Sequence, residues 1–275
     1  MASRRNEEAA ECLKKLESSD YAKNIKQQIE EAKAALSAVS TSAIIMVANP
    51  FHRAHERLVR ITLEKNDLVV IFLLDSHERE ELLPFALRKK TLQYFVENYL
   101  HKNRVLVIPL NSEYIGADCA DAANHGVVAK SLGCDTLVVG EHHNGIGFYY
   151  DNNHLRTSLD GYEGLARIEV VSRFVFCNEC NTLVSTRTCP HGMHHHIKYN
   201  SSSLVALLKE GILPPAVLMR KDISAIILSS IYPNRFKNIA QIYNDLFPGT
   251  GLIETHSDED FYMELMKLYQ TTSLT

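Results

Sequence analysis

Four short apolar runs alternate with helix-like segments in the first half of the sequence, and this alternation limits the fold more than any other feature. The runs are SAIIMVA, DLVVIFLL, RVLVIPL and DTLVVG. Continuous apolar runs of this length are typical of strands buried on both faces. Helical spacing of apolar residues appears between them, in NPFHRAHERLVRITLEK, LPFALRKKTLQYFVENYL and CADAANHGVVAKSLG. The pattern predicts an α/β fold with a doubly wound parallel sheet.

The chain divides into three predicted parts. Residues 1–40 are rich in Glu, Lys and Ala, and they predict one or two amphipathic helices for packing, for homo-oligomer formation or for docking a partner. Residues 41–225 carry the strand and helix pattern and form the predicted main domain. Residues 226–275 predict a small helical C-terminal segment whose apolar spacing is typical of core packing.

Composition excludes several classes of partner. The chain has 275 residues, is 45% hydrophobic and carries a formal net charge of -4. Nucleic-acid-binding proteins usually show clustered excess Lys and Arg, so we expect a small-molecule partner and no nucleic acid. The start MASRRNEEAAECLKKLE lacks an apolar signal core, and no run approaches the roughly 18 apolar residues of a membrane span. We therefore expect a cytoplasmic protein with no membrane contact.

Two segments with His and Asn follow predicted strands, where doubly wound sheets bind ligands. They are residues 49–55, NPFHRAH, and residues 140–147, GEHHNGIG. His52 and His55 are three residues apart at a helix start, so both imidazoles share one face and can reach one anion. The helix N-terminus favours the same anion. We predict a phosphate site here, with helix capping or metal binding as the alternatives.

This histidine pair suggests a reaction. Two imidazoles that donate to phosphate oxygens can stabilise the charge that develops when an α-phosphorus is attacked and pyrophosphate leaves. We therefore predict a nucleotidyltransferase with Asn49, His52 and His55 as catalytic residues. Two other classes stay open: a nucleotide-binding regulator without turnover, and a metal-dependent hydrolase that uses these histidines with His142 and His143.

A cysteine cluster predicts a metal site between residues 174 and 196. Cys177, Cys180 and Cys189 follow the spacing C-x2-C-x8-C and precede a run of histidines. Three thiolates and one imidazole form the closed tetrahedral zinc site that is usually structural. We predict a zinc knuckle with His194 as the fourth ligand and His191 as the alternative.

The stretch NPFHRAHERL resembles the ATP sulfurylase family, whose catalytic loop reads Asn-Pro-x-His-Arg-Ala-His-Glu. SLGCDTLVVGEHHNG, TCPHGMHHH and GILPPAVLMRKDI are similar to other segments of that family, and the similarity covers roughly residues 43–230. The resemblance implies an HxGH-type nucleotidyltransferase sheet, ATP with Mg²⁺, transfer of AMP to an oxyanion, and release of pyrophosphate. CTP stays open as the donor, because base recognition in this fold rests largely on backbone groups. Bacterial members include forms with a similar zinc knuckle.

The resemblance also assigns roles to matching residues. Asn49, His52 and His55 match triphosphate-binding groups, and Gly140 and His143 match a second loop that lies against the nucleotide. Val175 falls near a segment whose backbone contacts the base. Residues 201–203 match a phosphate-binding loop, with N-capping as the alternative, and Arg220 matches an active-site arginine, with a surface position as the alternative. The predicted nucleotide-binding set is Asn49, Phe51, His52, His55, Gly140, His142, His143, Val175 and Ser202.

The sequence departs from the family where the family binds sulfate. The family has Gln-x-Arg before the catalytic Asn, whereas this chain has Met46, Val47 and Ala48. The family's Gly-Arg-Asp is Gly140-Glu141-His142 here. A small dianion would lose charge-assisted hydrogen bonds worth roughly 1.5–3 kcal/mol each. We therefore expect a larger acceptor, such as a metabolite bearing a phosphate or phosphonate group, with sulfate as the alternative.

Overall fold

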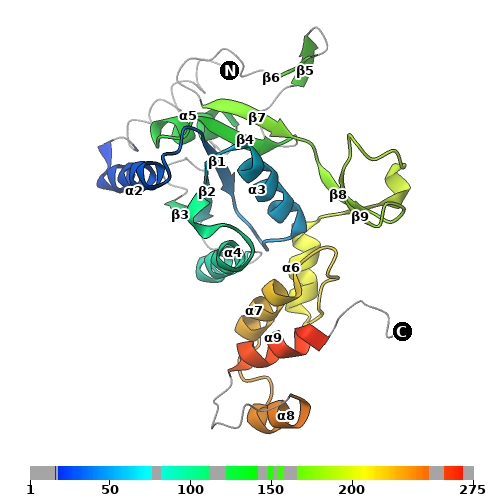
Figure 1. The fold of residues 1–275 in the computed structure, drawn as a ribbon. Helices are drawn as coiled ribbons and strands as arrows, with labels where there is room; N and C mark the ends of the chain where they lie inside the picture. Colours follow the sequence, from blue (N-terminus) through cyan, green and yellow to red (C-terminus); the bar gives the residue numbers. More distant parts are fainter. Residues whose placement is uncertain are drawn as a thin grey trace.

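The computed structural model confirms the predicted α/β class (Figure 1). The structure describes residues 16, 18–75, 82–111, 122–141, 148–151, 154–157, 166–247 and 257–268. The main sheet has five parallel strands in the order β3-β2-β1-β4-β7. The strands are β1 Thr41–Met46, β2 Leu68–Asp75, β3 Val105–Asn111, β4 Thr136–Gly140 and β7 Arg167–Val171. Because the strand order reverses between β1 and β4, the loops after these two strands border the expected ligand crevice.

Helices cover both faces of this sheet (Figure 1). On one face lie α3 (Arg53–Lys65) and α4 (Phe85–Tyr99), and on the other lie α2 (Asp20–Leu36) and α5 (Ala122–Ser131). Successive side chains of β2 point to opposite faces. Those at positions 69, 71 and 73 join the core under α3 and α4, and those at 68, 70 and 72 join the core under α2 and α5. Burial on both sides explains why this strand is apolar throughout.

Helix α2 is the helix predicted within residues 1–40. Its apolar stripe of Ala22, Ile25 and Ile29 is buried against the sheet. Ser19 caps its N-terminus, because the Ser19 hydroxyl accepts from the Ala22 N–H at 3.1 Å. The structure therefore supports packing as the role of this stripe.

Shorter strands lie outside the main sheet. Two of them form a hairpin, β5 (Phe148–Asp151) and β6 (His154–Thr157). Three form an antiparallel sheet in the order β10-β8-β9, with bounds β8 Phe174–Cys177, β9 Thr182–Ser185 and β10 His196–Lys198. The three-stranded sheet carries the cysteine cluster and leads directly into the helical C-terminal part.

The C-terminal part is helical, as its apolar spacing predicts. Its helices are α6 Ser201–Lys209, α7 Lys221–Ile231, α8 Ile239–Leu246 and α9 Asp258–Leu268, and two short 3-10 helices, η1 Lys102–Arg104 and η3 Met193–His195, occur earlier in the chain. Buried side chains of α7 and α9 belong to the same core as α3 and α4. The expected boundary between 225 and 226 falls inside α7. None of the helices in the described ranges combines the length and apolarity that a membrane span requires.

A buried arginine joins the carboxyl ends of β1 and β2. Arg88 is 1% exposed, and its Nη1 donates to the carbonyl oxygens of Val47 at 2.7 Å and Leu74 at 3.0 Å. Its Nε donates to the carbonyl oxygen of Leu83 at 3.0 Å. Burial lowers the pKa of Arg88 from its usual value, while the charge of Asp75 opposes that shift. Arg88 therefore fixes the carboxyl ends of β1 and β2, from which two loops on the ligand side of the sheet begin.

Replacing Arg88 with methionine should lower the free energy of unfolding by about 3 kcal/mol, because three carbonyl groups lose their donor. Urea denaturation measures this change. Arg57→Met is the control, since the Arg57 side chain on α3 is 47% exposed, and its effect should stay within about 0.5 kcal/mol. Equal losses in the two variants would contradict this role of Arg88.

Candidate functional site

The segment between β1 and α3 turns sharply at the carboxyl end of the sheet. Ala48 has a left-handed conformation with φ of 50°, which stores roughly 1–3 kcal/mol of strain. The Asn49–Pro50 peptide bond is cis. Asn49 Oδ1 accepts from the Leu83 N–H at 2.8 Å. Phe51 is 1% exposed and belongs to the core under α3 and α4, so its burial does not support the predicted contact with a nucleotide.

The structure brings the two histidines together. His52 is the N-cap residue of α3, and His55 lies in its first turn. Their rings are stacked, with centroids 3.8 Å apart and an interplanar angle of 15°. The His52 N–H donates to His55 Nδ1 at 3.3 Å, so neutral His55 carries its proton on Nε2. The spacing of three residues therefore places both rings at the helix N-terminus, where the His55 N–H also faces the His52 side chain in a capping box.

Burial keeps both imidazoles neutral near pH 7. Loss of hydration lowers the pKa of His55 to about 4. The same cause lowers the pKa of His52 well below its usual value, and the neighbouring His55 lowers it further. Each ring then offers one N–H donor. An anion bound beside the pair would favour the charged imidazolium and raise both pKa values.

Stability should therefore depend on His55 in acid. Because its pKa is lower in the folded chain than the unfolded value near 6.5, the unfolded chain binds more protons between pH 6.5 and 4. Stability is complete above this window and falls as the pH decreases through it, by up to about 3 kcal/mol. Urea denaturation of the wild type and His55→Gln at pH 7 and 4.5 should show the larger loss in the wild type. Equal losses would contradict the low pKa.

A second wall of the site comes from the segment that follows β10. The Tyr199 ring stacks on His52, with centroids 5.4 Å apart, and Ser201 Oγ lies 3.4 Å from His52 Nε2. The Tyr199 hydroxyl donates to the carbonyl oxygen of Val217 at 2.9 Å. Ser202, which the sequence favours as a nucleotide contact, is exposed in the first turn of α6. Ser201 rather than Ser202 therefore contacts the histidine pair.

Capping of α6 differs from the expectation. Asn200, not one of the three following serines, is the N-cap residue, and its Oδ1 accepts from the Ser203 N–H at 3.0 Å. An amide oxygen satisfies the free N–H groups of a first turn as well as a hydroxyl does. The hydroxyl of Ser201 is thereby left to face His52.

Other predicted contacts are placed in part. Gly140 is exposed at the end of β4, beside β1, and the next residue donates from its N–H to the Val171 carbonyl oxygen at 3.0 Å. Val175 lies in the central strand of the small sheet, with a strand on each side. Its contact with a base stays a prediction. His142 and His143 lie outside the described residues.

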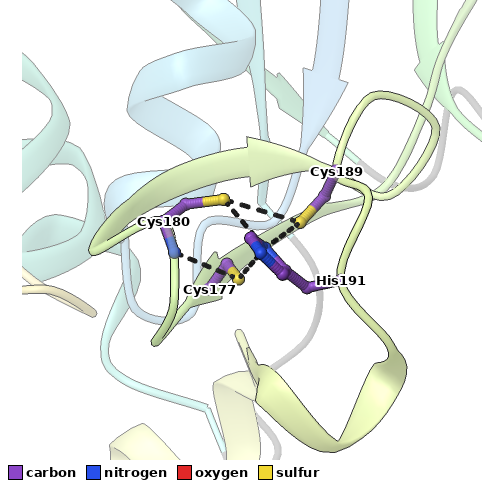
Figure 2. Close-up of side chains that lie close together, drawn as sticks. All are labelled: Cys177, Cys180, Cys189 and His191. Atoms are coloured by element: carbon purple, nitrogen blue, oxygen red, sulfur yellow. Dashed lines mark hydrogen bonds between the residues drawn. The ribbon is translucent and has the colours of Figure 1, made fainter.

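Three cysteines and one histidine converge in the small sheet, as Figure 2 shows. The ligand atoms of Cys177, Cys180, Cys189 and His191 all lie within 4.8 Å of one another. Cys180 Sγ is 3.8 Å from Cys189 Sγ and 3.2 Å from His191 Nδ1. Ligands at the Zn–S and Zn–N distances of about 2.3 and 2.0 Å would be separated by roughly these lengths in a tetrahedron. The four residues therefore fit a zinc ion.

His194, the predicted fourth ligand, lies outside the group of clustered ligand atoms, whereas its alternative His191 lies within it. His191 follows Cys189 by two residues, so its ring turns back toward the sulfur atoms. The chain then enters the 3-10 helix η3, where His194 is exposed and its ring lies against Gly192 and His195. The turn at Gly192 therefore directs His194 away from the cluster.

Strand β10 runs from the cysteine cluster toward the histidine pair. Its first residue, His196, pairs with Cys177 on β8, and His196 Nε2 lies 3.3 Å from Cys189 Sγ. Its last residue, Lys198, is followed immediately by Tyr199, which stacks on His52. The placement of Tyr199 against the histidine pair therefore depends on the strand that the cluster holds.

Arg220 lies behind the histidine pair rather than among the groups around it. It is the N-cap residue of α7, and two of its three guanidinium nitrogens donate to Glu56 on α3, Nε at 2.8 Å and Nη2 at 2.6 Å. Neither predicted alternative, an active-site arginine or a surface arginine, describes this half-buried ion pair.

Comparisons with known proteins agree with the geometry. A family model described as ATP-sulfurylase matches residues 21–230. A sulfate adenylyltransferase of Persephonella marina is 28% identical over 184 residues, which are 66% of this chain and 47% of that protein. One of Psychrobacter cryohalolentis is 31% identical over 192 residues, with 68% and 46% covered. The chain thus spans about half the length of the curated relatives it matches.

A solved structure shares the fold. A hexameric APS kinase from Thiobacillus denitrificans superposes with a TM-score of 0.52 and 12% identity, over 76% of this chain and 40% of that one. This likeness concerns the fold alone. The family match extends over most of the chain and includes both the loop that carries His52 and His55 and the cysteine cluster. By this match, the chain belongs to the ATP-sulfurylase family.

Proposed function

We propose that this protein is a nucleotidyltransferase that binds a nucleoside triphosphate over residues 49–55 and transfers its nucleotidyl group to a small acceptor, releasing pyrophosphate. The observation that carries the proposal is the stacked pair of His52 and His55 at the N-terminus of α3. That pair lies where the strand order of the sheet reverses, which is the ligand position of this architecture. Membership of the ATP-sulfurylase family supports the reaction type and favours ATP as the donor.

The rings would act as hydrogen-bond donors rather than as a nucleophile or base. Each neutral imidazole offers one N–H, and helix N–H groups lie beside them. His52 Nδ1 is buried, and the His52 side chain faces the backbone N–H of His55 in a capping box. Its Nε2, 3.4 Å from Ser201 Oγ, is the nitrogen that would contact a phosphate oxygen. Donors fixed in this way stabilise charge that develops on the phosphates as pyrophosphate leaves.

Mg²⁺ would accompany the triphosphate and neutralise part of its charge, as it does in phosphoryl transfer generally. The roles of Asn49, Gly140, Val175 and the second loop belong to the same proposal. The Asn49 side-chain oxygen accepts from the Leu83 N–H and so fixes the turn that carries the histidine pair.

The acceptor that we propose is a metabolite bearing a phosphate or phosphonate group, with sulfate as the alternative. Met46 and Ala48, which replace the sulfate-contacting residues implied by the resemblance, are 7% and 2% exposed and carry no charge. Arg88 reaches the same segment, but its guanidinium is buried and directed at main-chain carbonyls. Sulfate remains the alternative acceptor because the curated relatives are sulfate adenylyltransferases.

We also infer that the cysteine cluster holds a structural zinc ion. Three thiolates and an imidazole nitrogen are soft and borderline ligands that suit Zn²⁺, and four protein ligands close the coordination sphere. Bound there, the ion would cross-link the turn after β8, which carries Cys177 and Cys180, to the segment after β9, which carries Cys189 and His191.

The test is pyrophosphate release from each of the four nucleoside triphosphates with Mg²⁺. Acceptors are sulfate and a panel of phosphate, phosphonate and carboxylate metabolites. Release that requires one donor and one acceptor supports the proposal and identifies both substrates. Triphosphate binding by calorimetry without any release would instead support a nucleotide-binding regulator.

A further inference from the structure

A buried carboxylate, Glu56, directly follows His55 on α3. Glu56 is 7% exposed and is surrounded by three guanidinium groups. Besides the two bonds from Arg220, it accepts from Arg53 Nη1 at 3.0 Å and from Arg60 Nε at 3.2 Å. Burial would raise the pKa of Glu56, but hydrogen bonds and charge from Arg220, with a smaller contribution from Arg53, hold it below its usual value. Glu56 is therefore a charged group that depends on its partners.

Arg220 is held on a second side by an aromatic ring. Its guanidinium carbon lies 3.7 Å from the centroid of the Tyr99 ring on α4. The Tyr99 hydroxyl donates to Asp222, and burial together with this carboxylate raises the pKa of Tyr99 to about 12. A planar guanidinium that is stacked and bound by two bonds has one orientation, which a lysine ammonium would not reproduce.

The residues before Arg220 contact the start of α3 as well. The Arg53 N–H donates to the Leu218 carbonyl oxygen at 2.9 Å, and Arg53 Nε donates to the Ala216 carbonyl oxygen at 3.1 Å. Met219, between them and Arg220, is fully buried. Residues 216–220 are thus joined to the first turn of α3 by the main-chain and side-chain bonds of Arg53 at one end and by the Glu56 ion pair at the other.

The same segment also reaches the opposite wall of the site. The Val217 carbonyl oxygen accepts from the hydroxyl of Tyr199, whose ring stacks on His52. Residues 216–220 therefore contact both neighbours of the His52 ring, the helix that carries it and the aromatic side chain that covers it. A shift of this segment would move both.

We propose that Glu56 and Arg220 are positioning residues, which fix the His52 and His55 rings by locking residues 216–220 onto α3 without contacting the nucleotide. The kinetic consequence rests on the proposed nucleotidyltransferase function, whereas the consequence for the rings does not. Three guanidiniums around one carboxylate also leave this cluster positive, which favours an anion at the nearby helix N-terminus.

The experiment compares Arg220→Lys with Arg57→Lys. Arg57 lies on the exposed side of the same helix, 3.9 Å from Glu64, and is the matched control. NMR of ¹³C-labelled histidine rings, without nucleotide, gives the pKa of His55, and signals are assigned with His52→Ala and His55→Ala. In Arg220→Lys we expect this pKa to rise by at least about one unit, because a loosened ring regains hydration. Arg57→Lys should leave it unchanged.

Kinetics form the second arm. Arg220→Lys should lower kcat about 10- to 100-fold and change KM for the triphosphate by less than about threefold, since misplaced donors are felt mainly in the transition state. Glu56→Gln replaces Arg220→Lys if the latter fails to fold.

The two arms separate two failures. If the wild type releases no pyrophosphate but the pKa of His55 still rises in Arg220→Lys, the positioning role is supported and the proposed function is contradicted. If a folded Arg220→Lys or Glu56→Gln keeps both the wild-type ring pKa and the wild-type kcat, the positioning proposal is overturned.

Discussion

Replacing His52 with alanine should lower kcat for nucleotidyl transfer by about 10²- to 10³-fold, the loss expected when one donor to a developing negative charge is removed. The ring stacks between His55 and Tyr199, so no neighbouring side chain can take over its position. KM for the triphosphate should rise less than kcat falls, because the contact is strongest as pyrophosphate leaves. Steady-state pyrophosphate release measures both constants.

His101→Ala is the matched control for this experiment, because His101 is exposed and lies between α4 and η1. It should leave kcat unchanged. Urea denaturation of both variants shows whether each is folded. If the folded His52→Ala protein keeps the wild-type kcat, the histidine pair takes no part in the reaction and acts only as a helix cap.

Replacing Cys189 with alanine should remove zinc and weaken the nucleotide site at a distance. Cys177 of the cluster ends β8, which pairs with β10, and His196 at the start of β10 lies 3.3 Å from Cys189 Sγ; β10 then leads into Tyr199 and Ser201. A structural zinc ion contributes roughly 10–16 kcal/mol of folding free energy to small zinc domains. We therefore expect loss of bound zinc, proteolytic cleavage near residues 178–195, and a triphosphate affinity lowered about tenfold or more, equivalent to about 1.4 kcal/mol.

Cys134→Ala is the control for the cluster. Cys134 is buried in the core under α2 and α5 and lies outside the cysteine cluster. This variant should keep its zinc and its nucleotide affinity. Zinc content is measured by elemental analysis and affinity by calorimetry. If the Cys189→Ala protein keeps full triphosphate affinity after losing zinc, the nucleotide site does not depend on the cysteine cluster.

Much of the main sheet could be predicted because its central strands are buried on both faces. Strand β2 is apolar at nearly every position, so it can be recognised from the sequence without any knowledge of its neighbours. Strand β7 escaped prediction because Arg167 and Glu169 interrupt its apolar residues, as a strand at the sheet edge allows. The small sheet escaped because its strands are only three or four residues long.

In the site, sequence spacing sufficed where one helix turn decides the geometry. His52 and His55 share a face because they are three residues apart. Spacing could not choose between His191 and His194, since the 3-10 turn at Gly192 decides which ring faces the sulfur atoms. Tyr199 and Arg220 reach their partners across more than 140 residues of sequence, through contacts that only the folded chain creates.

The most direct test of nucleotidyl transfer traces the α- and γ-phosphates of the triphosphate into the products. ATP labelled at the α-phosphate and ATP labelled at the γ-phosphate are each incubated with Mg²⁺ and the acceptor panel. Nucleotidyl transfer requires that the α-label becomes bonded to the acceptor and that the γ-label is recovered in pyrophosphate, both only with intact His52. Recovery of the γ-label in orthophosphate or on the acceptor, with the α-label left in a nucleoside diphosphate, would contradict nucleotidyl transfer.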